Sequence, residues 1–431
     1  MNKSIELTID SLTYGGRGVG RYDGKAVFVP LVLPGERVLC RVVRGKKRYC
    51  EAELISVLQA SPDRRPPLCQ FFSDCGGCQW QHLPYPVQLH WKEKIFTDIL
   101  VRATGCAADR ILPIAAAPAE TGYRCRAQIR CRMTAQGLIA GFYQTGSHSI
   151  VDTDLCPVLD PLIPPLLRRF RSCMDHFSQA DKIPQIDFCV DSNRGISLVL
   201  HFCGTDMVGL MSALQSLDSK SELNLSIQTP DNRLISAIKG GAQSITPEDD
   251  SVLRLCFPPG GFIQINLQQN RRLVHEVLQN AVVSGRERIL DLYAGIGNFS
   301  LPLARKCAEV VAVEEYEPGV TAAIRNAADN HLENVRFIAG RSERVIKQLA
   351  DGPRFDTIVL DPPRSGAAEV VESLMKLQPD RIVYVSCDPM TLVRDLVSLL
   401  RGGYRLVSAR PIDMFPQTWH IEGIALLEKT K

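Results

Sequence analysis

The sequence RIVYVSCDP at residues 381–389 ends a strand pattern with a cysteine and a proline. Residues 382–385 are β-branched or aromatic, which is typical of a buried strand in a parallel sheet. Pro389 cannot continue a hydrogen-bonded ladder, so the chain must turn there. Because ligands of open α/β sheets bind at the carboxyl ends of the strands, Cys387 is a candidate nucleophile. A buried, inert thiol is the alternative interpretation.

An earlier stretch predicts that this strand belongs to a cofactor-binding sheet. A strand pattern at residues 288–292 leads into the small-residue turn YAGIGN and then a helical pattern, as in the first βα unit of a Rossmann-like sheet. The next strand, at 310–313, is followed by Glu314, which is placed to accept hydrogen bonds from ribose hydroxyls. Ser300 stands where a dinucleotide fingerprint has its third glycine, so S-adenosylmethionine is favoured over NAD.

The strand pattern at residues 355–360 ends in the sequence DPPR, which leaves two methylation chemistries open. In methyltransferases this motif often faces an exocyclic amine, so methylation of a base nitrogen is one of them. Methylation of uracil C5 is the other, because a thiolate that adds to C6 turns the weakly nucleophilic C5 into an enolate carbon. A base must then take the C5 proton, and residues 413–422 contain carboxylates and a histidine.

The first 60 residues predict a small basic β-barrel. Short strand patterns alternate with turn signals such as Asp23-Gly24 and Pro34-Gly35, which suggests five strands of the OB type. Residues 1–67 contain 12 Lys/Arg against 7 Asp/Glu. This segment resembles the TRAM module, a small RNA-binding barrel of RNA-modifying enzymes. A solvated barrel with basic loops is the alternative.

Four cysteines between residues 61 and 160 have the spacing of a metal or cluster site. They are Cys69, Cys75, Cys78 and Cys156. Gly76-Gly77 allows the backbone to wrap closely around a bound group. The spacing fits an iron–sulfur cluster as well as a tetrahedral zinc ion, with His82 as a possible zinc ligand.

The rest of residues 61–260 predicts an α+β scaffold. Helical spacing at residues 86–101 is followed by four arginines at even positions, which would share one face of a strand. They are Arg124, Arg126, Arg130 and Arg132. Such a face suits contacts to RNA phosphates, or is simply solvated.

The length and composition of the chain predict a multi-domain protein of the cytoplasm. A chain of 431 residues exceeds one ordinary core, and its net charge of +3 says little about partners. No signal-peptide pattern or membrane-spanning apolar run is present, so the 15 cysteines are expected to be reduced, metal-bound or catalytic.

Six motifs extend these hypotheses to a family. They are CGGCQWQH, FIQIN, DLYAGIGNFSLPLA, LDPPRSG, IVYVSCDP and DMFPQTWHIE. With them the chain resembles the bacterial RNA (uracil-5-)-methyltransferase family over nearly its whole length. It resembles most the branch that modifies 23S ribosomal RNA and carries a TRAM barrel and a [4Fe-4S] cluster. This implies an OB-type TRAM barrel at 1–60, a central α+β domain with the cluster at 61–260, and a Rossmann-like α/β class I methyltransferase domain at 261–431.

The resemblance also implies the roles of individual residues. Cys387 would be the nucleophile and Glu422 the base that removes the C5 proton. The cofactor site would contain Gln264, Tyr293, Asn298 (or the glycine turn around it), Glu314 and Asp361. The four cysteines would hold the [4Fe-4S] cluster, which favours iron over zinc. After the third strand the family often has a polar cofactor contact, and residues 340–343 (GRSE) leave that contact unassigned.

The function expected from the resemblance is transfer of a methyl group from S-adenosylmethionine to C5 of a uridine in 23S ribosomal RNA, through a covalent adduct of Cys387. Ribosomal RNA is the expected partner, with no membrane and no DNA. The oligomeric state stays open, with a monomer favoured. The alternatives are the same chemistry on transfer RNA, a base N-methyltransferase that uses DPPR, and an RNA-binding assembly factor without catalysis.

Overall fold

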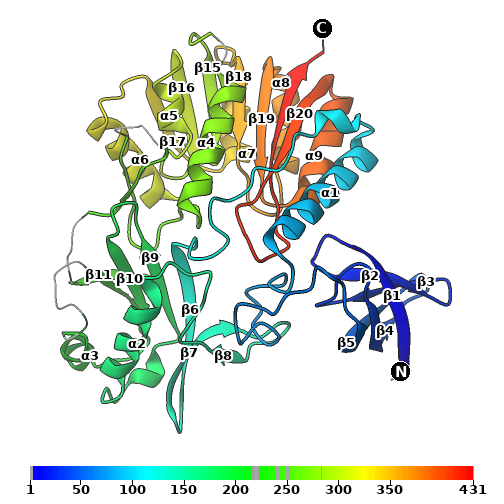
Figure 1. Cartoon of the computed structure of the whole chain (residues 1–431). Coiled ribbons are helices and arrows are strands. Elements are labelled where there is room, and N and C mark those ends of the chain that lie inside the picture. The colour runs from blue at the N-terminus through cyan, green and yellow to red at the C-terminus, as the bar shows by residue number, and fades with distance from the viewer. Residues whose placement is uncertain are drawn as a thin grey trace.

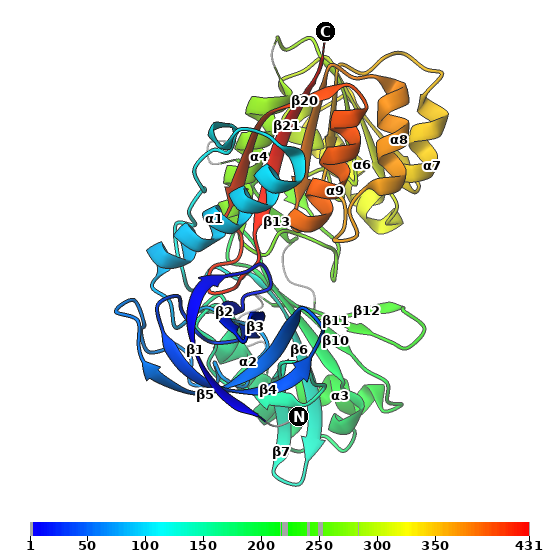
Figure 2. The same ribbon diagram turned by 90° about the vertical axis from the view of Figure 1, so that its right-hand side faces the viewer.

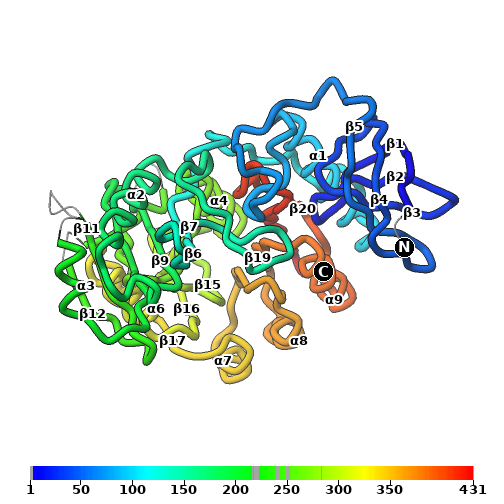
Figure 3. The backbone as a smooth tube through the Cα atoms, turned by 90° about the horizontal axis from the view of Figure 1, so that it is seen from below, coloured from blue at the N-terminus to red at the C-terminus, as the bar shows by residue number. Residues whose placement is uncertain are grey.

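The computed structural model describes residues 3–215, 217, 223–238, 242–248, 253–282 and 284–430. They form a closed five-stranded barrel and two seven-stranded sheets, with a further two-stranded ribbon (Figure 1). Seen from below, the barrel lies at one end and the central sheet at the other (Figure 3). In the part of the chain that is described, no helix combines the length and the apolar character needed to cross a bilayer.

The predicted N-terminal barrel is confirmed. Its strands are β1 (Ser4–Leu12), β2 (Gly18–Tyr22), β3 (Lys25–Val29), β4 (Arg37–Gly45) and β5 (Tyr49–Gln59). They close in the order β1-β2-β3-β5-β4. Alternate residues of β1, namely Ile5, Leu7 and Ile9, fill the barrel core, as the period of two predicts.

The central sheet is mostly antiparallel and has the order β12-β11-β10-β9-β6-β7-β8. Its strands are β6 (Arg126–Thr134), β7 (Gly137–Tyr143), β8 (Ile150–Asp152), β9 (Gln185–Val190), β10 (Ile196–His201), β11 (Leu223–Gln228) and β12 (Leu234–Ile238). The helices α2 (Ile163–Met174) and α3 (Met207–Leu214) share its hydrophobic core through side chains such as Phe170 and Leu210. Short elements beside it are the 3₁₀ helix Ala180–Lys182 and the ribbon of β13 (Ser244–Ile245) and β14 (Leu255–Cys256).

The C-terminal sheet has the order β17-β16-β15-β18-β19-β21-β20. Its strands are β15 (Arg288–Leu292), β16 (Glu309–Glu314), β17 (Val335–Ala339), β18 (Thr357–Leu360), β19 (Arg381–Ser386), β20 (Tyr404–Ile412) and β21 (Glu422–Lys429). The first five are parallel, and the order changes direction at β15, which is where open α/β sheets bind ligands.

Helices cover both faces of this sheet. They are α4 (Leu267–Ala281), α5 (Ser300–Ala304), α6 (Glu317–Asp329), α7 (Ser342–Leu349), α8 (Ala368–Leu377) and α9 (Pro389–Arg401). Ile346, Leu374 and Leu396 place α7, α8 and α9 in one core cluster, and Val274 and Leu303 place α4 and α5 in another.

The pairing of β21 with β19 fixes the position of Glu422. The two strands are antiparallel, and their register runs from Arg381 opposite Glu428 to Ser386 opposite Gly423. Cys387 is the first residue after β19, and Glu422 is the first residue of β21. The antiparallel pairing therefore brings both residues to the same end of the two strands.

The helix α1 (Tyr85–Thr104) packs against α9 and β20, although its sequence lies within the segment assigned to the central domain (Figure 2). The short 3₁₀ helix Ala108–Arg110 follows it, and the next residues pair with β20 through bridges at Ile111 and Ala115. The ammonium of Lys92, fully buried in α1, lies 2.6 Å from a carboxylate oxygen of Asp413 and donates to the carbonyl of Phe415. This ion pair fixes the loop that precedes Glu422.

Replacing Lys92 with methionine is expected to lower the free energy of unfolding by about 3–5 kcal/mol, because Asp413 is then a buried charge without its partner. Urea denaturation measures the change. The control is Lys94→Ala on the same helix, which removes an exposed pair with Asp98 and is expected to cost less than about 1 kcal/mol. Equal losses in the two variants would contradict the prediction.

Candidate active site

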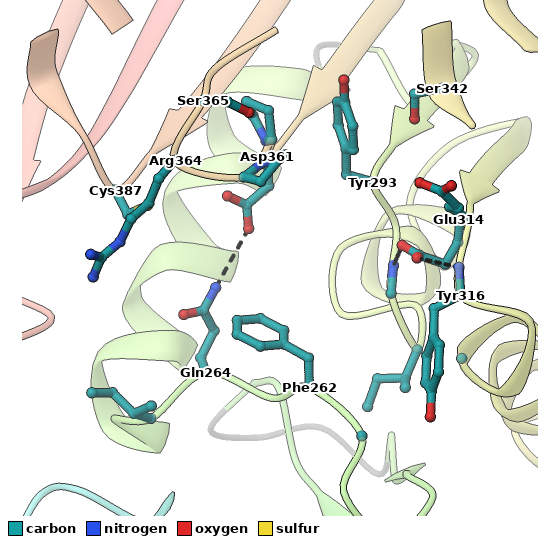
Figure 4. A pocket seen from close by; sticks show the side chains of 18 of the residues that line it. Phe262, Gln264, Tyr293, Glu314, Tyr316, Ser342, Asp361, Arg364, Ser365 and Cys387 are labelled. Carbon is teal, nitrogen blue, oxygen red and sulfur yellow. Dashed lines mark hydrogen bonds between the residues drawn. The ribbon is translucent and has the colours of Figure 1, made fainter. Parts of the chain in front are cut away.

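A pocket of about 1280 Å³ lies at the carboxyl ends of the parallel strands, with the central sheet forming its other wall. Six of the predicted residues line it, namely Gln264, Tyr293, Glu314, Asp361, Cys387 and Glu422. Figure 4 shows two groups among the residues that it labels, with Glu314 and Tyr293 on one side and Asp361 and Cys387 on the other. Phe262, 64% exposed, lies between the groups.

The first group is suited to a nucleoside. The carboxylate of Glu314, at the end of β16, accepts hydrogen bonds from the backbone N–H groups of Gly295 and Tyr316, each at 2.8 Å (Figure 4). Gly295 has a φ of 57°, and a Cβ atom there would meet only open space. The backbone of the turn is thereby open to a ligand, and Glu314 is held facing it.

Residues 340–343 contribute to the same side. Ser342 is buried and lines the pocket, and Glu343 accepts a 2.8 Å hydrogen bond from the hydroxyl of Tyr293. Tyr293 itself has a φ of 65°, which is unusual for a residue with a bulky side chain. The sequence could not choose among these residues, because the orientation of the turn after β17 depends on the neighbouring strands.

The second group is suited to proton and nucleophile chemistry. Cys387 lies in the two-residue connection between β19 and α9, where Asp388 caps α9 by accepting from the N–H groups of Met390 and Thr391. Burial, together with the carboxyl groups of Glu422 and Asp361, raises the pKa of Cys387 to about 12, and the guanidinium of Arg364 opposes this. The thiol is therefore protonated at neutral pH without a bound substrate.

The two carboxyl groups on this side of the pocket, those of Asp361 and Glu422, both have raised pKa values. Burial raises the pKa of Glu422 well above its ordinary value, and the charge of nearby Asp361 adds to this. Burial also raises the pKa of Asp361, which accepts a 3.4 Å hydrogen bond from the amide of Gln264 (Figure 4). Perturbed groups that share one pocket are typical of catalytic sites.

Asn298 is not among the residues that line the pocket, and its contact with the cofactor stays a prediction. Its side-chain amide exchanges two hydrogen bonds with Asn270 of α4, at 2.8 and 2.9 Å. The alternative, the glycine turn around it, is what lies in the pocket, at Gly295 and Ile296. Sequence reasoning also missed Arg364 and Tyr316, whose only signal was their position after a strand end.

The loop before Glu422 is fixed from the side of α1. The carbonyl of Gln417 accepts hydrogen bonds from the backbone N–H groups of Gln79 and Trp80, at 3.1 and 3.0 Å. Its own N–H donates to the side chain of Gln88, at 2.9 Å. The segment next to Cys78 thus holds the loop that ends at the candidate base.

The four cysteines of the predicted cluster line one small cavity, which shares the lining residues Arg124 and Phe142 with the candidate active site. The N–H of Gly77 donates to the sulfur of Cys75 at 3.4 Å. His82, the alternative zinc ligand, does not line this cavity. Within the described ranges, no group of three or more His, Cys, Asp or Glu side chains is arranged to hold a metal ion.

The sequence model described as tRNA (Uracil-5-)-methyltransferase matches residues 88–430, which is more than half of the chain. The chain belongs to this family. It is therefore an S-adenosylmethionine-dependent RNA (uracil-5-)-methyltransferase. The TRAM domain model matches residues 2–55, which confirms the prediction made for the N-terminal barrel.

Relatives of the chain in this family include two proteins named 23S rRNA (uracil(1939)-C(5))-methyltransferase RlmD. The protein of Pectobacterium atrosepticum is 36% identical over 431 residues, covering 98% of this chain and 93% of the relative. That of Aeromonas hydrophila is 35% identical over 434 residues, covering 99% and 96%.

One solved structure shares the fold over nearly the whole length. It is the Pyrococcus abyssi tRNA (uracil-54, C5)-methyltransferase in complex with S-adenosyl-L-homocysteine, with a TM-score of 0.75 and 24% identity. The match covers 98% of this chain and 100% of the other.

Replacing Glu314 with glutamine is expected to weaken the binding of S-adenosylmethionine by about 10- to 100-fold, because hydrogen bonds to a charged acceptor are replaced by neutral ones. Isothermal titration calorimetry measures the affinity. Glu317→Gln, three residues further on and exposed, is the matched control and should bind as the unchanged protein does. Equal affinities in both variants would exclude Glu314 from the cofactor site.

Proposed function

We propose that this enzyme methylates C5 of a uridine in 23S ribosomal RNA, with Cys387 as the covalent nucleophile and Glu422 as the base. The observation that carries the chemistry is that Cys387 and Glu422 line one pocket, each next to the end of the β19–β21 ladder at Ser386 and Gly423. The names of the relatives that are about 35% identical support ribosomal RNA as the substrate.

Cys387 acts on C6 of the uracil ring. Its thiol gives up its proton to solvent, the thiolate forms a bond to C6, and the electron pair of the C5–C6 double bond becomes an enolate that extends from C5 to the oxygen on C4. Arg364 favours the thiolate through its positive charge. When bound, S-adenosylmethionine supplies the methyl group that the nucleophilic C5 accepts.

Glu422 completes the reaction. After methylation, C5 carries both the methyl group and a proton, and the carboxylate of Glu422 takes that proton. The electron pair re-forms the C5–C6 double bond and expels the thiolate of Cys387. A carboxylate whose pKa is raised by burial is a stronger base than an exposed one, so burial of Glu422 suits this step.

The residues that would hold S-adenosylmethionine are those of the first group. Glu314 would accept hydrogen bonds from the ribose hydroxyls, and the turn at Gly295 leaves room beside the backbone. Tyr293, Gln264 and Asp361 would complete the site, as the sequence predicts. Asp361 lies at the boundary of the two groups because Gln264 donates to it.

The two catalytic roles give opposite variant phenotypes. Cys387→Ala is expected to abolish both methylation and any protein–RNA adduct. Glu422→Gln is expected to accumulate a methylated adduct, because nothing removes the C5 proton. Incubation with S-adenosylmethionine and ribosomal RNA, followed by a denaturing gel, detects the adduct.

Matched controls are available for both positions. Cys50→Ala, in the barrel, and Glu428→Gln, on β21 like Glu422, should methylate normally and leave no adduct. Turnover by Cys387→Ala would refute the covalent step, and normal turnover without an adduct in Glu422→Gln would assign the base to another residue.

Removing Arg364 is expected to move the rate of adduct formation to higher pH. The pKa of Cys387 lies above neutrality, so the thiolate fraction rises with pH, and loss of the Arg364 charge raises this pKa further. Near neutral pH, the Arg364→Gln variant should therefore form the adduct more slowly than the unchanged enzyme. The difference in rate should become smaller as the pH rises. Single-turnover kinetics measures the profile, and Arg354→Gln, an exposed arginine paired with Asp380, should leave it unchanged.

Transfer RNA is the second candidate substrate, because the family model and the neighbour with the shared fold both carry that name. Mapping of 5-methyluridine in RNA from a deletion strain separates the two substrates. A product methylated on a base nitrogen would instead favour the reaction typical of the DPPR motif.

The division into domains at 1–60, 61–260 and 261–431, the monomeric state and the cytoplasmic location remain predictions from the sequence.

We further propose that the four cysteines bind a [4Fe-4S] cluster. The donors fit, because thiolates are soft ligands that select zinc or iron–sulfur clusters, and all four line one cavity. Such a cluster would join the segment of residues 69–78 to Cys156, beside the central sheet.

Protein purified without oxygen is expected to contain iron and to show broad visible absorption, and Cys78→Ala should lose both. Cys106→Ala, whose thiol is outside the cavity, is the matched control. Metal analysis that finds zinc, or no metal, in the unchanged protein would refute the cluster.

A further inference from the structure

A second groove, of about 600 Å³, adjoins the active-site pocket. The two share four lining residues, namely Arg124, Phe142, Arg364 and Phe415. One wall is residues 143–148, at the end of β7 and in the connection to β8, and another part of the lining includes Phe415 and His420 from the loop before Glu422. Of its lining residues, only Arg364 has a role in the reaction proposed above.

The wall at residues 143–148 presents stacked rings to the solvent. Tyr143 and His148 are both exposed, and their rings are stacked with centroids 5.4 Å apart and planes inclined by 20°. The guanidinium of Arg130, one of the arginines at even positions, lies 5.3 Å from the centroid of the Tyr143 ring. Arg130 and His148 thus both lie against the ring of Tyr143, and the exposed rings of Tyr143 and His148 offer flat surface to another flat group.

This wall is held in place by the cysteine segment. The carbonyl of Tyr143 accepts a 2.9 Å hydrogen bond from the N–H of Gly76, and Thr145 donates from its own N–H to the carbonyl of Asp74. Cys75 and Gln144 form an isolated β-bridge. The rings are therefore presented by backbone that is hydrogen-bonded on its inner side, which lowers the entropy cost of binding.

Two aromatic side chains of the loop before Glu422 also line the groove. The rings of Phe415 and His420 meet edge-on with centroids 5.7 Å apart, and Trp419, which is not a lining residue, packs on His420 at 4.0 Å. Burial lowers the pKa of His420 to about 4, so this ring is uncharged at neutral pH. Between the walls, Arg124 and Arg364 supply positive charge at the junction with the active-site pocket.

We propose that this groove binds the base of an unpaired nucleotide that neighbours the target uridine, stacked on the exposed rings of Tyr143 and His148. The inference rests on the proposed function. A uridine that enters the pocket must leave its stack, and the nucleotides beside it lose a stacking partner. Aromatic side chains replace such partners in proteins that bind single-stranded RNA, and the two arginines at the junction suit the phosphates between the bases.

The test combines protein variants with altered RNA. Short RNA substrates that contain the unmethylated target uridine are made with one abasic nucleotide. This nucleotide is placed in turn at each position next to the target. The value of kcat/KM is measured for the unchanged enzyme and for the double variant Tyr143→Ala/His148→Ala. In the unchanged enzyme, one abasic position should lower kcat/KM about tenfold or more. In the double variant, that same position should have no further effect.

Two further variants separate stacking from a structural effect. Tyr143→Phe keeps the ring and should behave as the unchanged enzyme, and His176→Ala, an exposed histidine outside the groove, should also do so. If every abasic position changes kcat/KM by the same factor in the double variant and in the unchanged enzyme, the groove assignment is overturned and the proposed function is not affected. Failure of the unchanged enzyme to methylate any uridine would overturn the proposed function, and the groove assignment with it.

Discussion

The antiparallel pairing of β21 with β19 is the constraint on which the site depends. Five strands of the C-terminal sheet are parallel and bring strand ends and turns to one edge, as in other open α/β sheets. β21 runs the opposite way, so its first residue, Glu422, lies where β19 ends and Cys387 begins the turn. A slip of one residue would turn Glu422 to the other face of the sheet.

The loop that leads to β21 connects this pairing to the rest of the molecule. Its polar backbone groups are satisfied by Lys92 and Gln88 from α1, and by Gln79 and Trp80. The indole N–H of Trp80 also donates to the carbonyl of Gly16 in the barrel, at 3.2 Å. Hydrogen bonds therefore connect the barrel and the cysteine segment to the loop that leads to the candidate base.

The barrel is close-packed against this loop. Gly16 has a φ of 82°, and a Cβ atom there would lie only 2.7 Å from the ring of Trp419. Tyr14 meets the same ring edge-on at 4.9 Å. The TRAM barrel is thus fixed against the loop that leads to the candidate base.

The sequence by itself determined the barrel, the Rossmann-like sheet and the residue types of the site, because these follow from local patterns. Strand periodicity, the glycine turn before Phe299 and the proline after Cys387 are readable without a partner. The tertiary structure decided what depends on neighbours distant in sequence. The side chain of Asn298 is hydrogen-bonded to Asn270, and α1 packs against α9 and β20. The pairing of β19 with β21 brings Cys387 and Glu422 to the same end of the two strands. Hydrogen bonds and registers of this kind join residues far apart in the chain, and no local pattern encodes them.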